Sequence, residues 1–253
     1  MKPIAIIKLG ETYPDVAARL GGFADWVVEG LAHDHLPRCV TDVTAGASLP
    51  APQTIAGTVL TGAHDMLTDC PAWSDRVSLW LRRVVAAGVP VLGICYGHQL
   101  LAHTFGGRVD NNPLGREFGT TAVHLAEAAI TDPLFRGLPK TFSAHVCHCQ
   151  SVIELPPAAV SLAWNRHDRH QAFRFGSSAW GVQFHPEFSE AAAAAYVTAS
   201  AEDLRIEGRQ PSRLKKGIVP TPFAADILPR FGRLVSNAAP TGANAGIPAT
   251  SVG

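Results

Sequence analysis

Short apolar runs alternate with stretches of helical periodicity through the first hundred residues. The runs predict four buried strands, at residues 4–9, 38–43, 57–60 and 89–94. Before the fourth strand, apolar residues recur at the spacing of one helix face, at Val77, Trp80, Leu81 and Val84. Gly88 can end this helix because glycine tolerates positive φ. The alternation predicts an α/β fold in which helices cover both faces of a mostly parallel sheet.

Beyond residue 107 the segments become shorter and richer in β-forming residues, with frequent proline and glycine. They predict a smaller antiparallel β segment. Ser189 can cap a helix that runs from Glu190 to Arg205 through an alanine-rich stretch, and Gly208 can end it.

These elements suggest one main domain over residues 1–209 and a C-terminal extension over 210–231. From residue 232 onward the chain is almost entirely small and polar. Such a segment buries too little apolar area to offset its loss of entropy on ordering, so residues 232–253 are predicted to be a disordered tail.

Composition narrows the functional classes. The chain has 253 residues, 47% of them hydrophobic, with 21 basic residues against 21 acidic ones. This balance argues against nucleic-acid or anionic-membrane partners. The apolar run at residues 4–7 is too short for a signal peptide, and none approaches the ~20 residues that span a bilayer. Five cysteines without a disulfide-scaffold spacing favour a reducing, cytoplasmic location.

Cys95 lies where a predicted strand runs directly into a predicted helix. Gly93 and Gly97 flank it at the spacing of a nucleophile elbow, where the absence of side chains permits a tight turn. A helix N-terminus favours a thiolate, and the N–H of Tyr96 would face a developing oxyanion. Taken alone, the pattern equally allows a buried structural cysteine.

A base and a group that orients it follow downstream. His185 is placed where a predicted strand ends at Pro186, and Glu187 comes two residues later. In an extended segment these two side chains can share one side, so the carboxylate can fix the imidazole tautomer. A solvated loop pair is the alternative. The order Cys, His, Glu favours nucleophilic catalysis.

The segments 93–99 and 181–187 resemble the two hallmark motifs of class I glutamine amidotransferases. The likeness is strongest to the amidotransferase domain of GMP synthases and its stand-alone relatives, and it covers about residues 1–205. It implies a flavodoxin-like α/β fold, glutamine as substrate and no cofactor. It also implies that Cys95 forms a γ-glutamyl thioester, that His185 moves protons and that Glu187 orients His185.

The resemblance assigns further residues to the site. It places backbone donors of the oxyanion hole at Gly62 or Ala63, in addition to Tyr96. It also assigns substrate-binding positions, at Gln99, Glu117, Phe118, Cys147 and His148. The family pattern is altered at two neighbouring positions, where Cys149 replaces a glycine and Gln150 an acid, which puts contacts there in doubt.

Two clusters have competing interpretations. Residues 145–149 contain two histidines and two cysteines, the donors that zinc prefers, but so short an extended run cannot close a tetrahedron. We expect no metal there, and half-buried strand residues near the pocket instead. The charged segment 165–170 is interpreted as a solvated hairpin tip.

The first functional hypothesis is hydrolysis of glutamine to glutamate and ammonia, with the ammonia passed to an acceptor. Because the sequence has no Walker-type phosphate loop and few residues after 205, we expect a synthetase-type partner to receive the ammonia. One alternative is a γ-glutamyl peptidase or hydrolase that acts on γ-glutamyl conjugates. Another is a non-catalytic regulatory subunit with the same fold.

Overall fold

The computed structural model describes residues 1–31, 35–69 and 71–238. Its strands are β1 (Ile4–Lys8), β2 (Arg38–Asp42), β3 (Gly57–Leu60), β4 (Val91–Ile94), β5 (Arg108–Asn111), β6 (Glu117–Leu125), β7 (Thr141–His148), β8 (Gln150–Glu154), β9 (Val160–Trp164), β10 (Ala172–Phe175) and β11 (Ala179–Val182). Its α-helices are α1 (Pro14–Leu20), α2 (Phe23–Gly30), α3 (Ala72–Ala86), α4 (Tyr96–Thr104), α5 (Glu190–Ala199), α6 (Ala201–Ile206), α7 (Pro211–Lys216), α8 (Pro222–Ala225) and α9 (Ile227–Ala238). Short 3-10 turns are η1 (Pro52–Thr54), η2 (Leu67–Asp69) and η3 (Glu127–Ile130).

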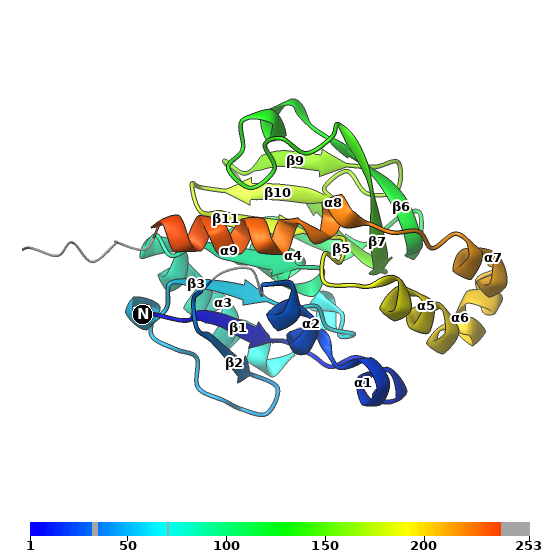
Figure 1. Cartoon of the computed structure of the whole chain (residues 1–253), viewed down its shortest axis with the longest axis horizontal. Helices are drawn as coiled ribbons and strands as arrows, with labels where there is room; N and C mark the ends of the chain where they lie inside the picture. Colours follow the sequence, from blue (N-terminus) through cyan, green and yellow to red (C-terminus); the bar gives the residue numbers. More distant parts are fainter. Residues whose placement is uncertain (32–34, 70, 239–253) are drawn as a thin grey trace, which may run out of the picture.

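One large mixed sheet runs through the molecule (Figure 1). Its strand order is β2-β1-β3-β4-β11-β10-β9-β6-β7. The strands from β2 to β11 pair in parallel, whereas those from β11 to β7 pair antiparallel. A separate two-stranded sheet joins β5 to β8. The predicted α/β fold is confirmed, and most of its antiparallel segment extends the parallel sheet.

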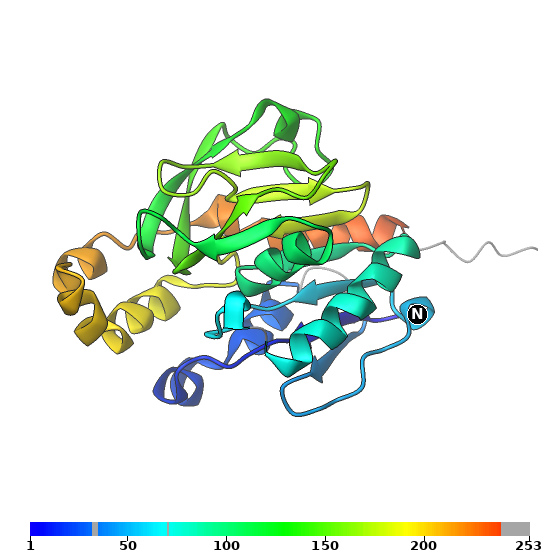
Figure 2. The ribbon, with the colours of Figure 1, turned by 180° about the vertical axis from the view of Figure 1, so that it is seen from behind.

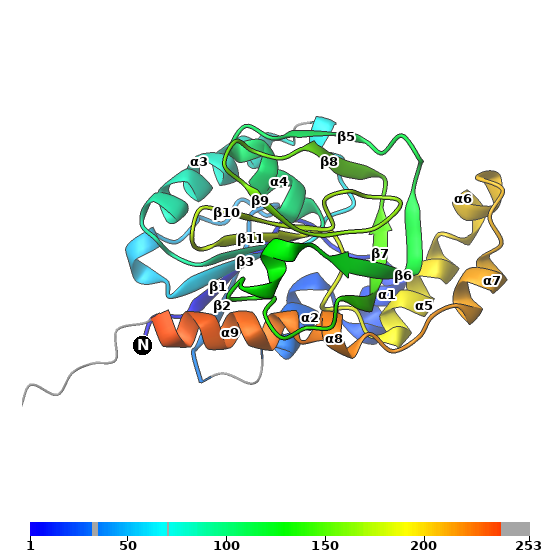
Figure 3. The same ribbon diagram turned by 90° about the horizontal axis from the view of Figure 1, so that it is seen from above.

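Alternation along the strands explains why both faces of the sheet are covered. On β1, Ile4 and Ile6 belong to one buried cluster, and Ala5 and Ile7 to the other, because successive side chains of a strand point to opposite faces. The first cluster is shared with α2 and α9, and the second with α3 and α4. Figures 2 and 3 show these helix pairs on opposite sides of the parallel strands.

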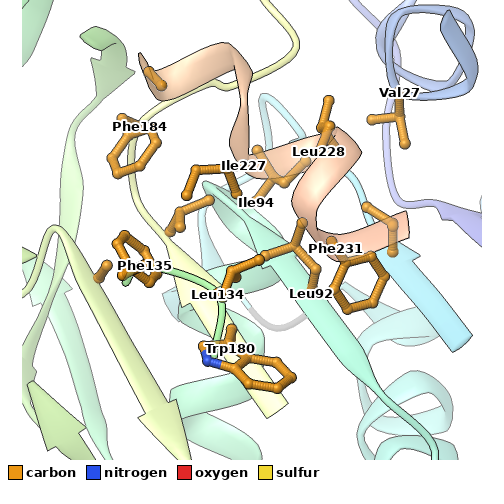
Figure 4. Close-up of a cluster of buried hydrophobic side chains, with 14 of the residues drawn as sticks. Val27, Leu92, Ile94, Leu134, Phe135, Trp180, Phe184, Ile227, Leu228 and Phe231 are labelled. Atoms are coloured by element: carbon orange, nitrogen blue, oxygen red, sulfur yellow. The ribbon is translucent and has the colours of Figure 1, made fainter. Parts of the chain in front are cut away.

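The C-terminal helix corrects one prediction. Residues 232–238, expected to begin a disordered tail, form the last turns of α9, and Val235 is fully buried. Ile227, Leu228 and Phe231 pack from this helix onto the strands and α2, near Leu92 (Figure 4). The small-residue composition concealed an apolar stripe that begins before residue 232. Residues 239–253 lie outside the described part of the chain.

The helix predicted over residues 190–205 is interrupted at Ser200, which separates α5 from α6. Its start is as expected, since the Oγ of Ser189 accepts a hydrogen bond from the N–H of Ala192 at 3.1 Å. Gly208, with φ of 74°, follows the end of α6. Among the described residues, every helix is too short or too polar to cross a bilayer.

Candidate active site

Cys95 is held in a strained turn between β4 and α4. Its φ of 50° is in the left-handed region, which side-chain-bearing residues adopt at a cost of about 1–3 kcal/mol. The turn is possible because of its glycines. A Cβ at Gly93 would lie 2.4 Å from the carbonyl oxygen of Gly97, and one at Gly97 would lie 2.6 Å from the carbonyl oxygen of Leu60. The helix therefore packs directly on the backbone of β3 and β4.

His185 and Glu187 follow β11, the strand that pairs with β4 in parallel. The Nδ1 of His185 lies 2.7 Å from the Oε1 of Glu187, and both side chains are buried. The backbone N–H of His185 donates to the carbonyl of His145 at 2.9 Å. The ring of Phe188 stacks on the imidazole with 4.1 Å between centroids. These contacts fix both the tautomer and the plane of the imidazole.

The environment of His185 favours its charged form. Burial alone would lower the pKa of His185, but the Glu187 carboxylate and then Cys95 outweigh it and raise that pKa to about 10. An imidazolium next to the sulfur stabilises the negative charge of a thiolate, the nucleophilic form of cysteine.

The nucleophile and the base converge on the turn after β3. A Cβ at Gly62 would lie 3.4 Å from the Cε1 of His185 and 3.7 Å from the Cβ of Cys95. Cys95 is only 6% exposed, and its Sγ lies 3.8 Å from the carbonyl oxygen of Cys147. Three segments distant in sequence thus meet around one sulfur atom.

A cavity of about 170 Å³ opens over Cys95. This is smaller than the roughly 300–1,000 Å³ of sites for drug-sized ligands, so it suits a molecule the size of an amino acid. Its lining includes Ala63 and Tyr96, two of the predicted oxyanion-hole residues, whereas Gly62 lies beside it. Gln99, Cys147 and His148, predicted to bind substrate, also line it.

Two predicted substrate-binding residues lie behind this wall instead of in it. Glu117 is directly opposite His148 in the antiparallel register of β6 and β7, and its Oε2 forms a hydrogen bond with the Nε2 of that histidine. Phe118 belongs to a buried hydrophobic cluster that also contains Phe23 and Phe188. Both are therefore one layer removed from the cavity.

The segment 147–150, which contains the two altered positions, is tied into the structure. Burial raises the pKa of the Cys147 thiol above its usual range, so this thiol stays neutral. The carboxamide of Gln150 accepts a hydrogen bond from the N–H of Leu67 at 2.9 Å and donates to the Oγ1 of Thr68 at 2.7 Å. These two hydrogen bonds hold η2, which follows the turn that contains Gly62 and Ala63. The described residues contain no group of three or more metal-type side chains arranged around one point.

The segment 165–170 is less solvated than predicted. Asn165 and Asp168 are 5% and 2% exposed. The Nδ2 of Asn165 donates to the Oε1 of Glu117 at 2.6 Å, and its own Oδ1 accepts from the N–H of Asp168 at 2.7 Å. The hairpin tip is folded inward because it supplies a donor to a buried carboxylate.

Tyr13, Arg116 and Asp203 are among the cavity-lining residues that were not predicted. Arg116 directly precedes the predicted Glu117, and it forms ion pairs with Asp203 at 3.8 Å and Glu207 at 3.2 Å. Tyr13 precedes α1 and Asp203 is on α6. Only the fold brings Tyr13 and Asp203 to this position, whereas Arg116 adjoins a segment that the sequence had already assigned to the site.

Comparisons with known proteins point to one family. A family model described as glutamine amidotransferase class-I matches residues 71–201. The chain is 34% identical over 188 residues to a glutamine-hydrolyzing GMP synthase of Aeropyrum pernix, a match that covers 73% of this chain and 32% of that protein. Identity to the GMP synthase of Thermosipho melanesiensis is 41% over 105 residues, which cover 41% of this chain and 20% of the relative. The chain thus spans a third or less of these relatives.

Solved structures share the fold. A glutamine amidotransferase from Methylobacillus flagellatus superposes with a TM-score of 0.73 at 22% identity, covering 94% of each chain. One from Thermotoga maritima gives 0.72 at 18% identity and covers 94% of this chain and 99% of the other. The segment matched by the family model is just over half of this chain and contains Cys95, His185 and Glu187. The chain therefore belongs to the class I glutamine amidotransferase family.

Proposed function

We propose that this chain hydrolyses the side-chain amide of glutamine through a thioester on Cys95 and releases ammonia for an acceptor. The observation that carries the proposal is the buried His185–Glu187 pair, 2.7 Å apart, beside a cysteine on a strained elbow. A purely structural cysteine needs neither the strain nor the oriented imidazole.

The protonation state of His185 sets the order of proton transfers. The Cys95 thiolate attacks the amide carbon, and a C–S bond forms as the carbonyl oxygen becomes an oxyanion. The imidazolium of His185 then gives its proton to the departing nitrogen, the C–N bond breaks and ammonia leaves. The neutral imidazole next takes a proton from water, whose oxygen attacks the thioester. Breaking of the C–S bond releases glutamate and restores the thiolate–imidazolium pair.

Backbone N–H groups supply the oxyanion hole. Tyr96 begins α4, where the macrodipole favours negative charge, and Ala63, in the turn after β3, lines the same cavity. Ala63 fits this role better than Gly62, since Gly62 lies beside the cavity. Losing one such donor typically costs about 100-fold to 1,000-fold in kcat.

The ammonia acceptor is proposed to be a synthetase-type partner or domain. The resemblance to glutamine-hydrolyzing GMP synthases supports this, because the match covers 32% of the A. pernix relative and the rest of that relative lies outside the match. The amidotransferase domain is proposed to cover residues 1–209, with the segment from 210 as an extension. Within the described part of the chain, α9 of that extension packs on the core.

Ammonia release from glutamine tests the proposal. The wild-type chain and Cys39→Ser should release ammonia, with or without a synthetase-type partner, whereas Cys95→Ser should not. Cys39 is a matched control because it is a free, half-buried cysteine on β2. A diazo-ketone analogue of glutamine should label Cys95 alone. Turnover confined to γ-glutamyl conjugates would indicate a γ-glutamyl hydrolase, and an unlabelled, inactive protein would indicate a regulatory subunit.

A further inference from the structure

A buried pair of side chains joins the cavity wall, at His148, to Glu117 behind it. The Nε2 of His148 is 2.9 Å from the Oε2 of Glu117, and the two side chains are 1% and 8% exposed. Two amides also donate to this carboxylate, Asn165 at 2.6 Å and Gln171 at 2.8 Å. Both carboxylate oxygens are therefore satisfied, as a buried charge requires.

The partners of His148 determine its protonation. Its Nδ1 lies 2.9 Å from the backbone carbonyl oxygen of Gln150, while its Nε2 faces Glu117. A carbonyl and a carboxylate can only accept, so each of the two contacts requires a donating N–H on the ring. Burial would raise the pKa of Glu117, but the hydrogen bond and charge of His148 outweigh it and hold that pKa below its usual range.

The same carbonyl of Gln150 orients Gln99. The Nε2 of Gln99 donates to it at 2.8 Å and to the Oε1 of Gln183 at 3.0 Å. A backbone carbonyl cannot donate, so the nitrogen of Gln99 must face it whichever way the amide is drawn. Gln99 lines the cavity, and no hydrogen bond to its Oε1 is found within residues 1–31, 35–69 and 71–238. That oxygen is the atom left for a ligand.

We propose that Glu117 and His148 are positioning residues that act through the Gln150 carbonyl to present the Oε1 of Gln99 to the substrate. The site then selects a substrate that offers an N–H donor at this point. The inference rests on the proposed γ-glutamyl chemistry, and glutamine has two such donors, its α-ammonium and its side-chain carboxamide. Removing Glu117 leaves the His148 charge unpaired, which loosens the carbonyl and the amide that it orients.

Substrate analogues separate this role from a merely structural one. Wild type and Glu117→Gln are assayed for kcat/KM on glutamine, on glutaramate, which lacks the α-ammonium, and on glutamate γ-methyl ester, which lacks the carboxamide N–H. The variant should lose about tenfold to 100-fold on glutamine, the size of a hydrogen bond to a polar or charged donor. On one of the two analogues, the one that lacks the donor contacted by the Oε1 of Gln99, the variant should lose less than about twofold in kcat/KM. Glu154→Gln, an exposed carboxylate on β8, is the control.

Two further measurements guard against a folding defect. Gln99→Met removes the oxygen itself, and adding Glu117→Gln to it should cause no further loss if Glu117 acts through Gln99. Nitrogen-15 spectra of the wild-type protein should show both ring nitrogens of His148 protonated. A parallel loss on all three substrates, additive effects in the double variant or a neutral His148 would overturn the inference. A wild type that turns over no γ-glutamyl compound would instead refute the proposed function.

Discussion

The sharpest test of the elbow is Gly93→Ala. Its new Cβ would lie 2.4 Å from the carbonyl oxygen of Gly97 and 2.8 Å from the nitrogen of His98. Ordinary contact begins at 3.4 Å, so β4 and the first turn of α4 must separate by about 1.0 Å. Because β4 lies between β3 and β11, the strand cannot move freely.

Two magnitudes follow from this displacement. Overpacking of this kind costs about 1–3 kcal/mol, and the gain from replacing glycine in the unfolded chain offsets about 0.4–1 kcal/mol of it. The net loss of about 1–2 kcal/mol should lower Tm by roughly 2–8 °C in a protein of this size. A shift of about 1 Å in the nucleophile costs about 100-fold in rate. Reactivity should therefore suffer more than stability.

Thermal unfolding and the rate at which a diazo-ketone glutamine analogue labels Cys95 measure the two effects. Gly217→Ala is the matched control, since its Cβ would meet backbone oxygens at 3.4 and 3.5 Å. If Gly93→Ala has the same Tm as this control and is labelled at the same rate, the close approach of β4 and α4 does not hold the elbow, and the reasoning fails.

Three other changes probe the charge, the core and the loop. Glu187→Gln removes the carboxylate that contributes most to raising the pKa of His185 to about 10, so burial should then lower that pKa. A raised histidine pKa stabilises the fold below pH 6.5, and this stabilisation is lost as the pH approaches 10. In urea unfolding, the free energy of unfolding of wild type should therefore exceed that of Glu187→Gln by less and less across this range. A difference that stays constant contradicts the assignment. Phe231→Ala should lower the free energy of unfolding by about 3–5 kcal/mol, against under about 0.5 kcal/mol for the exposed Phe223→Ala, and equal losses would be inconsistent with α9 as a core helix. Gln150→Met should speed amide hydrogen exchange in η2, and unchanged exchange there would show that the Gln150 side chain does not hold η2 in place.

The sequence predicted those parts of the site that are local. The elbow around Cys95 and the His185–Glu187 pair each occupy a few consecutive residues, so their geometry follows from one turn or one strand end. The rest depends on pairings between distant segments. Asn165 and Glu117 are 48 residues apart, and the burial of their contact could not be read from either segment. The inward position of Glu117 likewise depends on the register of β6 with β7.

The order of the strands explains why the reacting groups are local and the cavity wall is not. Cys95 and His185 follow β4 and β11, which are adjacent and parallel, so both side chains emerge at the carboxyl edge of the sheet, where open α/β sheets bind ligands. The chain between them, residues 96–178, forms α4 and the strands from β5 to β10, and it supplies Gln99 and His148 to the cavity. The catalytic pair thus belongs to the parallel half, while much of the wall belongs to the inserted segment. Changes at wall residues of that segment that contact neither Cys95 nor His185 can alter the accepted substrate without moving the sulfur relative to the imidazole.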